Sequence, residues 1–525
     1  GALYEFDSYL RTVNFMIAIL QFDSVSLPVL DKLLQQGHLP AISKLRQRGQ
    51  WYKLDTPASS FEGGTHYTLY SGRHVGNHGI YFPFMWSPTS QRVLHRYNLQ
   101  TPDPVWDRIG RAGRRSLVID PYEAKPPQYL QGAGLGGWQF RHKITLHSWS
   151  VPRGLARQLK HQFGAPPSVE EVYGRPSLSD LAKMREVLTT APRRLADTVV
   201  ELICREEFDL VWVTLSSGHI AGHWFFDPSQ LPQDQFDQKE RAKFGTALAD
   251  SYRAIDDALS HILETLPAGA DVILMSPNGM GSNISRAHLL PGMLHAVLEG
   301  GSQQHASNTS PGSAIWRLRT AIPTGFRTAV ARALPEWATL ELTARLELRG
   351  TDWAKTRAFM MPSGDCGYVR LNLKGRERDG IVKAEDAEGL LEDIACGLQT
   401  FRDPDGFPTV RMVERGVHIL GCDTHAHHFP DLVVYWNDRV PPHFAGVTSS
   451  QYGEVPAIGW GSGRTGEHRD DAWALVVPGT STLSPPTKPL HIVDMASTIC
   501  SVLGVDGEGL AGQPLLERGQ ESAHR

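Results

Sequence analysis

Short runs of apolar, often β-branched residues recur along the chain, and each run ends in polar or turn residues. The six clearest runs are Phe15–Phe22, Ser116–Ile119, Asp209–Leu215, Asp271–Met275, Asp431–Trp436 and Trp473–Val477. Uninterrupted apolar runs of this length are typical of strands in a parallel sheet, because both faces of such a sheet are covered. We therefore predict that these runs are buried parallel strands.

Longer segments with apolar residues at helical spacing lie between these runs. The clearest of them are Leu27–Arg48, Val105–Ala112, Leu181–Glu206 and Gln238–Leu266. Strands that alternate with helices over this length predict an α/β fold, in which helices sandwich a mainly parallel sheet.

Two regions interrupt this alternation. Residues 125–176, rich in Gly, Pro, Trp and His, are predicted to form a lid-like insertion within a first core part that spans residues 14–299. Residues 300–385 show little strand–helix rhythm and are predicted to form a cap or linker region. Residues 386–520 are then expected to complete the core.

The composition is that of an ordinary globular protein. The 525 residues are 41% hydrophobic and 21% charged, and the formal net charge is only -4. Since no long basic or acidic run is present, the chain is not expected to coat nucleic acid. The five cysteines are scattered and form no CxxC pair, so a disulfide framework is not expected. This pattern is typical of proteins of the reducing cytosol.

The apolar segments are short. None reaches the roughly 18 residues of a transmembrane helix, and Phe15–Leu20 is not followed by a signal-peptide cleavage pattern. We therefore expect a cytoplasmic protein without a transmembrane segment. No sequence feature indicates the oligomeric state.

Several residues with chemical potential come just after predicted strands. Asp23 follows the first run, His219 and His223 follow the third, and Asn278 follows the fourth. In parallel α/β sheets, ligands bind beyond the carboxyl ends of the strands. These side chains are therefore candidates for one common site.

Five separated motifs occur in a fixed order, and they are QFDSV, SSFEGGTHYTLYSGRHVGNHGIY, SSGHIAGHWFFD, MSPNGMG and GRTGEHRDDAWALVVPG. In this order the chain resembles the type I phosphodiesterase/nucleotide pyrophosphatase branch of the alkaline phosphatase superfamily. The resemblance implies an alkaline-phosphatase-like fold with inserted cap segments, and a hydrolase or transferase for phosphate esters. It also implies two metal ions about 4 Å apart, which clamp a phosphoryl group while a Ser or Thr attacks it in line.

The resemblance assigns metal-ligand roles to Asp23, His223 and His468. Where the family has an aspartate four residues before His223, this chain has His219. His219, His223 and His468 could therefore form a three-imidazole site, which suits zinc, with Mn²⁺ or another divalent metal as the alternative. In the competing interpretation, His219 only fills space and hydrogen-bonds a neighbour.

The second metal site departs further from the family pattern. Pro277 and Asn278 stand where the family has an Asp-His pair. Proline offers no ligand atom, and an amide is a poor ligand for a transition metal compared with imidazole. A second metal is therefore doubtful, and Asn278 is kept as a candidate catalytic residue.

The position of the nucleophile can be counted in two ways. Counting forward from Pro57 places it at Ser60, whereas counting back from Gly72 places it at Glu62. Ser60 would supply an alkoxide at a helix N-terminus, unless Ser59 and Ser60 merely cap the helix that contains His66–Tyr70. Glu62 could instead act as a general base, a metal ligand or a carboxylate nucleophile.

Three functions follow from these residues. The first is a metal-dependent enzyme that acts on a phosphate ester or related small anionic substrate, with one well-formed metal site. The second is a scaffold redirected to non-phosphate group transfer or hydrolysis with one zinc. The third is a binding protein that has lost catalysis, because loss of one metal removes much of the charge neutralisation that phosphoryl transfer needs.

Overall fold

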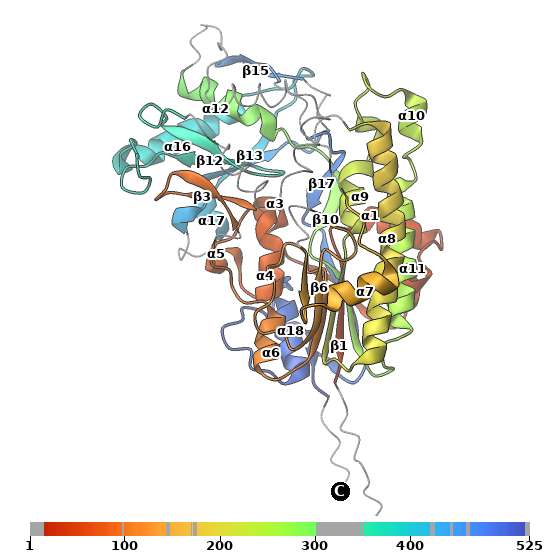
Figure 1. The fold of residues 1–525 in the computed structure, drawn as a ribbon. Helices are drawn as coiled ribbons and strands as arrows, with labels where there is room; N and C mark the ends of the chain where they lie inside the picture. The colour runs from red at the N-terminus through yellow and green to blue at the C-terminus, as the bar shows by residue number, and fades with distance from the viewer. Residues whose placement is uncertain are drawn as a thin grey trace, which may run out of the picture.

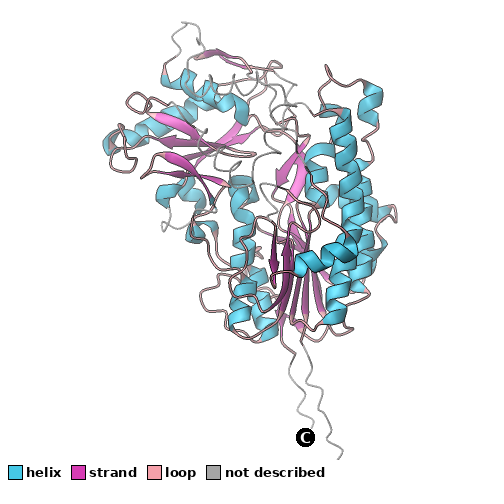
Figure 2. Cartoon of the chain, in the orientation of Figure 1, coloured by secondary structure: helices cyan, strands magenta, loops and turns pink. Residues whose placement is uncertain are grey.

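The computed structural model describes residues 15–96, 99–142, 148–169, 171, 176–300, 348, 351–420, 426–440, 445–457 and 462–519. Two parts are visible in Figure 1, a large sheet covered by helices and a smaller sheet beside the carboxyl ends of its strands. Figure 2 shows the same parts by secondary structure.

The large sheet has eight strands in the order β2-β18-β9-β1-β8-β5-β6-β7. Their bounds are β2 (Gln50–Leu54), β18 (Ala472–Val477), β9 (Asp271–Ser276), β1 (Ile17–Phe22), β8 (Leu210–Leu215), β5 (Ser116–Ile119), β6 (Gly132–Gly136) and β7 (Trp149–Val151). Neighbours from β9 to β6 pair in parallel, whereas β2, β18 and β7 pair antiparallel at the two edges. The predicted α/β class is confirmed.

Helices cover both faces of this sheet (Figure 1). One face packs against α1 (Leu27–Gln35), α2 (Pro40–Arg46), α8 (Leu178–Arg205), α9 (Ser217–Phe225) and α11 (Ala247–Leu263). The other packs against α4 (Thr65–Ser71), α6 (Val105–Arg111) and α18 (Asp494–Leu503). Within the described ranges, no helix combines the length and apolarity needed to cross a bilayer.

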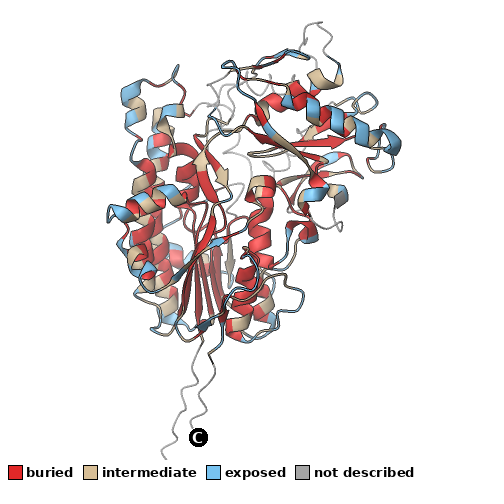
Figure 3. Cartoon of the chain, turned by 180° about the vertical axis from the view of Figure 1, so that it is seen from behind, coloured by how far each residue is buried: buried red, intermediate tan, exposed pale blue. Residues whose placement is uncertain are grey.

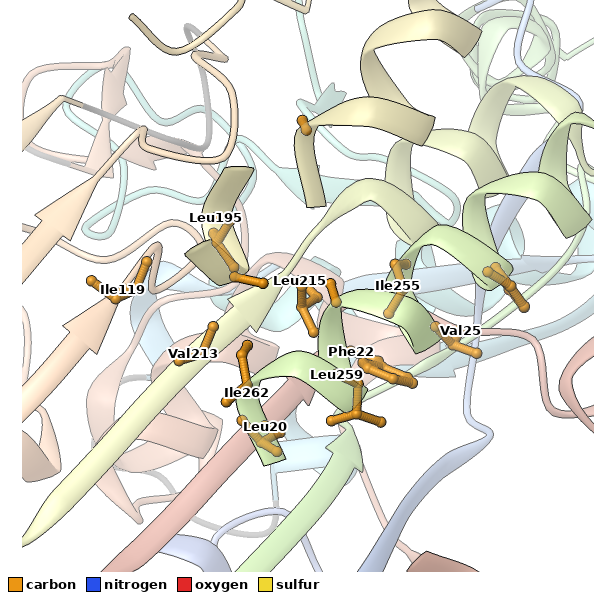
Figure 4. Packing of buried hydrophobic residues seen from close by; sticks show 14 of the residues in the cluster. Leu20, Phe22, Val25, Ile119, Leu195, Val213, Leu215, Ile255, Leu259 and Ile262 are labelled. Atoms are coloured by element: carbon orange, nitrogen blue, oxygen red, sulfur yellow. The ribbon is translucent and has the colours of Figure 1, made fainter. Parts of the chain in front are cut away.

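Strand β1 shows why the apolar run is uninterrupted. Leu20 and Phe22 pack on one face of the sheet, where Figure 4 shows them with Leu259 and Ile262 of α11. Ile17 and Ile19 pack on the opposite face. Both sets are removed from water, and a fully buried side chain of this size stabilises the fold by about 2 kcal/mol.

Two segments predicted as single helical stretches are each broken. Gly37, with a φ of 73°, follows α1, and Pro40 begins α2. A left-handed glycine and a proline at the first helical position are ordinary stop and start signals. The second segment divides into α10 (Gln238–Ala242) and α11.

The smaller sheet is antiparallel throughout, with strands in the order β11-β12-β14-β13. Their bounds are β11 (Ala358–Met361), β12 (Gly367–Leu371), β14 (Leu432–Trp436) and β13 (Val410–Arg415). One face packs against α12 (Leu290–Leu298) and α16 (Ala384–Gln399). We call these four strands and two helices the cap. Figure 3 shows that its helices are exposed on their outer side, while the central strands of the large sheet are buried.

Two strand predictions need correction. The run Asp431–Trp436 lies in the antiparallel cap sheet, and Trp473–Val477 lies in the large sheet but antiparallel to both neighbours. Both strands are buried on both faces. An uninterrupted apolar run reports that burial and carries no information about strand direction.

The stretch 125–176 is not a simple lid, because it supplies β6 and β7 to the large sheet and continues into α7 (Leu155–Phe163). Its glycines suggested a loop, yet a Cβ on Gly134 would lie 2.8 Å from the ring of Trp149. Glycine therefore permits close strand packing here.

The domain boundary placed at residue 385 falls inside the cap. β12 lies before it and β13 after it, and both contribute to one hydrophobic cluster with α16. Within the region 300–385, residues 301–347 and 349–350 lie outside the described residues.

Candidate active site

Three histidines converge beyond the carboxyl ends of β1 and β8. Helix α9 begins directly after β8, and its residues His219 and His223 lie one turn apart on the same face. His468 comes from β17 (Gly466–Arg469). The Nε2 atom of His219 is 2.9 Å from Nε2 of His223 and 3.0 Å from Nε2 of His468.

The outer ring nitrogen of each histidine is held by an acceptor. His219 Nδ1 is 2.8 Å from Asp23 Oδ2, and His223 Nδ1 is 2.9 Å from the carbonyl oxygen of Gly466. His468 Nδ1 lies 3.0 Å from Asp365 Oδ2 and 3.2 Å from Glu62 Oε2.

Carboxylate and carbonyl oxygens only accept, so these partners favour the tautomer with hydrogen on each Nδ1. Three Nε2 lone pairs then face one small volume, where they repel each other unless a cation lies between them. Histidine ligands characteristically donate their second nitrogen to a carboxylate or carbonyl in this way. The donor set therefore fits one divalent metal.

The protonation equilibria agree with this arrangement at two of the three rings. Burial lowers the pKa of His219, and burial together with the nearby Arg464 lowers the pKa of His223 well below its usual range. Burial also disfavours a charged His468, but its hydrogen bonds to Asp365 and Glu62 raise its pKa to about 10. A divalent metal at Nε2 would take the place of that proton.

Glycine allows the two ligand-bearing elements to meet. A Cβ on Gly466 would lie 2.2 Å from the carbonyl oxygen of Gly222 in α9. Next to it, the amide of Thr465 donates to the carbonyl oxygen of His223 at 2.7 Å. The GRTGEH segment therefore packs directly on the helix that carries His219 and His223.

Asp23 lies in the turn after β1 and is fully buried. Its Oδ1 is 2.9 Å from Nε2 of His66, and its Oδ2 bonds His219. Burial would raise the pKa of Asp23, but His219 and His66 together hold it well below its usual range. The structure thus places Asp23 beside the three histidines, with both of its oxygens bonded to imidazoles.

The predicted second metal position has few ligands. Asn278 Oδ1 accepts a 2.9 Å hydrogen bond from Ser24 Oγ, and the Asn278 carbonyl accepts one from Ser276 Oγ. Among the described residues, the groups that could hold a metal are His219/His223/His468 and Glu62/Asp365/His468. Neither group includes Asn278 or Asp23.

The structure separates the two candidates for the nucleophile position. Ser60 Oγ is 2.7 Å from the hydroxyl of Tyr435, and the Ser60 carbonyl accepts a hydrogen bond from Tyr368, so Ser60 faces the cap. Glu62 instead reaches His468. Helix α4, which contains His66 and Tyr70, has Gly64 at its N-cap and no side-chain cap, so Ser59 and Ser60 do not cap it.

The carboxyl group of Glu62 lies next to that of Asp365. Burial and the adjacent Asp365 raise the pKa of Glu62 to about 7, against the opposing effect of His468. The backbone approaches closely here, since a Cβ on Gly364 would lie 1.7 Å from Glu62 Oε1. Glu62 is thus a half-buried acid–base group beside a candidate metal ligand.

Sequence reasoning missed three residues at this site. Asp365 comes from the turn between β11 and β12, and His66 comes from α4. The side chain of Glu171 is buried and accepts hydrogen bonds from Trp224, Arg464 and His142. Asp365 and Glu171 lie outside the motifs quoted above, and His66 lies inside one of them but was given no role, because its contact with Asp23 is visible only in the tertiary fold.

The chain belongs to the type I phosphodiesterase/nucleotide pyrophosphatase family, whose model matches residues 17–440. This confirms the predicted resemblance and the predicted enzyme class, a phosphodiesterase-like hydrolase.

Among solved structures, the chain is similar to phosphonoacetate hydrolase from Sinorhizobium meliloti in complex with phosphonoformate, with 12% identity and a TM-score of 0.49 over 94% of this chain and 96% of that one. It is also similar to murine ectonucleotide pyrophosphatase/phosphodiesterase 5, with 12% identity and a TM-score of 0.49 over 96% and 100% of the two chains. At these scores the likenesses support no residue-level argument. No curated protein sequence matches the chain.

Proposed function

We propose that this chain hydrolyses phosphate esters or related small anionic substrates with one divalent metal, held by Nε2 of His219, His223 and His468. The observation that supports this proposal is the convergence of three Nε2 atoms, with neighbouring distances of 2.9 and 3.0 Å, while each Nδ1 is bonded outward. Three imidazoles and an open position are typical of catalytic zinc, with Mn²⁺ as the alternative.

A metal bound there would supply Lewis acidity toward a phosphoryl oxygen and would lower the pKa of water. The chain's own residues orient that centre. Asp23 holds the ring of His219, and Asp365 holds both the backbone amide and the ring of His468.

We assign the proton-transfer role to Glu62, at Oε2. This carboxyl group lies 3.2 Å from His468 Nδ1 and is partly accessible, with 16% of its side chain exposed. Ser60, by contrast, is bonded to Tyr435. Hydrolysis by water is therefore favoured over transfer through a serine intermediate.

Metal analysis and a substrate panel test the proposal. The purified protein is expected to contain about one zinc per chain, and chelation is expected to abolish hydrolysis of aryl phosphate mono- and diesters. Glu62→Gln should lower kcat/KM by about 10²- to 10⁴-fold, whereas Ser60→Ala, the matched control in the same loop, should stay close to wild type. A metal-free protein that chelators do not affect would refute the metal, and an inactive Ser60→Ala would refute the role of Glu62.

A second candidate is hydrolysis or group transfer on a non-phosphate substrate with the same single metal. It is favoured by the scarcity of ligands for a second metal, since Asp23 is bonded to two imidazoles and Asn278 to Ser24. Phosphoryl transfer suffers most when half of its charge neutralisation is missing. Carboxylic esters and amides in the same panel would reveal this activity, and selective turnover of phosphate esters would exclude it.

A cytosolic location is also a proposal. It rests on the cysteine pattern, and the described Cys204, Cys366, Cys396 and Cys500 are free thiols. Fractionation of cells that express the full-length protein would test it.

A further inference from the structure

A line of buried charged groups leads away from the three histidines on the far side of Asp23. Asp23 Oδ1 is 2.9 Å from His66 Nε2, and His66 Nδ1 is 3.7 Å from Glu123 Oε2. Arg96 Nη1 lies 2.9 Å from the same Glu123 oxygen. We call Asp23, His66 and Glu123 the buried array.

Four separate elements bring these groups together. Asp23 follows β1, His66 lies in α4, Glu123 follows β5, and Arg96 follows β4 (Arg92–His95). Glu123 and Ser24, next to Asp23, have φ values of 61° and 53°. Such left-handed conformations of non-glycine residues are costly, and they persist where the surrounding structure fixes them.

The array is almost closed to solvent. The exposed fractions are 0% for Asp23, 4% for His66 and 6% for Glu123. Charged groups lose their hydration when they are buried, and this cost offsets much of their mutual attraction. Apolar residues of similar size would therefore stabilise the fold about as well as this array does. Its position next to the three histidines points to a role in the site.

The aromatic packing joins the array to the histidine site. The ring of Tyr122 lies 5.0 Å from the ring of His66 and 4.8 Å from the ring of His219, centroid to centroid. His66 and His219 are therefore held by the same two groups, the Asp23 carboxylate and the Tyr122 ring. Both groups therefore contact His66 and His219 at once.

We propose that His66 is a positioning residue for the metal centre: through Asp23 it holds the ring of His219 with Nδ1 protonated and Nε2 aimed at His223 and His468. This inference rests on the proposed function. With one oxygen bonded to His66, Asp23 cannot rotate, so its other oxygen stays in line with His219 Nδ1. Without His66, the carboxylate gains alternative orientations and His219 gains its other tautomer.

Metal affinity and coordination geometry test this role. His66→Leu removes the hydrogen bond to Asp23, and the Kd for Zn²⁺, measured by competition with a chromophoric chelator, should rise by about 10- to 100-fold. The visible absorption spectrum of the Co²⁺-loaded protein should change as well, because it reports ligand geometry. His66→Gln, whose amide can still donate to Asp23, should restore most of the affinity and the spectrum.

His78→Leu is the matched control. His78 is a second buried histidine near α4, and its Nε2 lies 2.9 Å from Thr68 Oγ1, outside the array. This variant should lower the Tm and leave the Kd for Zn²⁺ and the Co²⁺ spectrum unchanged. A folded His66→Leu protein with wild-type Kd and spectrum would overturn the inference.

Two other outcomes are informative. If His66→Leu does not fold, Glu123→Gln decides the question, because it preserves the shape of the side chain at the end of the array. A weaker Zn²⁺ affinity in this variant supports the inference, and an unchanged affinity overturns it. If the wild-type protein binds neither Zn²⁺ nor Co²⁺, the proposed function itself fails. The wild-type measurement thus separates the two failures.

Discussion

The Nδ1 atom of His223 lies 2.9 Å from the carbonyl oxygen of Gly466. This hydrogen bond joins α9, which carries His219 and His223, to β17, which carries His468. His223 thereby fixes the distance between α9 and β17. The proposed metal site depends on this junction, because it sets His468 against His219 and His223.

Gly466→Ala is expected to open that junction. The new Cβ would lie 2.2 Å from the carbonyl oxygen of Gly222, so β17 must move away from α9. We expect a loss of about 1–3 kcal/mol in the free energy of unfolding together with loss of bound zinc, measured by urea titration and metal analysis. Gly389→Ala, at an exposed site in α16 with open space around the new Cβ, should be neutral or slightly stabilising. Full zinc occupancy in Gly466→Ala would contradict the importance of the junction.

Asp365→Asn is expected to weaken the metal centre from the cap side. Asp365 Oδ2 accepts from both the ring and the backbone amide of His468, at 3.0 and 2.9 Å. Loss of this carboxylate should reduce Zn²⁺ affinity or kcat/KM by about 10- to 100-fold, measured by chelator competition and steady-state kinetics. Asp470→Asn, an exposed carboxylate that bonds the amide of Ser59, is the control with a small expected effect. Equal effects of the two changes would argue against a specific role for Asp365.

Restoring the family's Asp-His pair at positions 277 and 278 should not be enough to create a second zinc site. The double change Pro277→Asp and Asn278→His is expected to leave about one zinc per chain, because both oxygens of Asp23 stay bonded to His66 and His219. Adding His219→Asp frees one of these oxygens, and the triple variant should bind more than one zinc. Zinc-to-protein ratios after dialysis measure the outcome, and two zinc ions in the double variant would refute this reasoning.

His491 is expected to make the fold sensitive to acid. Burial, with His74 and Lys488 nearby, lowers the pKa of His491 to about 4. Since the unfolded chain takes up this proton near pH 6.5, the contribution of neutral His491 is complete above pH 6.5 and is lost as the pH falls toward 4. The loss amounts to roughly 2–3 kcal/mol.

His491→Asn tests this directly, because the asparagine oxygen can replace Nδ1 as the acceptor for the amide of Val493. The variant should lose less stability than the wild type between pH 7.5 and pH 4.5 in urea titrations. The exposed His161→Asn should keep the wild-type pH dependence. A His491→Asn protein with the full wild-type loss would assign the acid sensitivity elsewhere.

The sequence carries the large sheet because its strands follow short-range patterns, whereas His468 was joined to His219 and His223 by the resemblance to the family. β1 and β8 are buried on both faces and appear as apolar runs, and the carboxyl ends of parallel neighbours bring Asp23 and His219 to one edge. Such runs report burial and encode neither the direction of a strand nor the sheet to which it belongs. The prediction that β14 is a parallel strand of the large sheet is therefore wrong. The surroundings of Ser60 and Glu62 likewise depend on the fold, because Ser60 bonds Tyr435 and Glu62 bonds His468.

Asp365 had no detectable signal, because it reaches His468 only when the cap is in place. It lies in the turn between β11 and β12, and the neighbouring Trp436 of β14 bonds its carbonyl oxygen through Nε1. Tyr368 and Tyr435 of the cap sheet also bond Ser60, two residues before Glu62. A cap exchanged for one from a relative would therefore change the surroundings of His468 and Ser60. The cap and the large sheet therefore have to be engineered together.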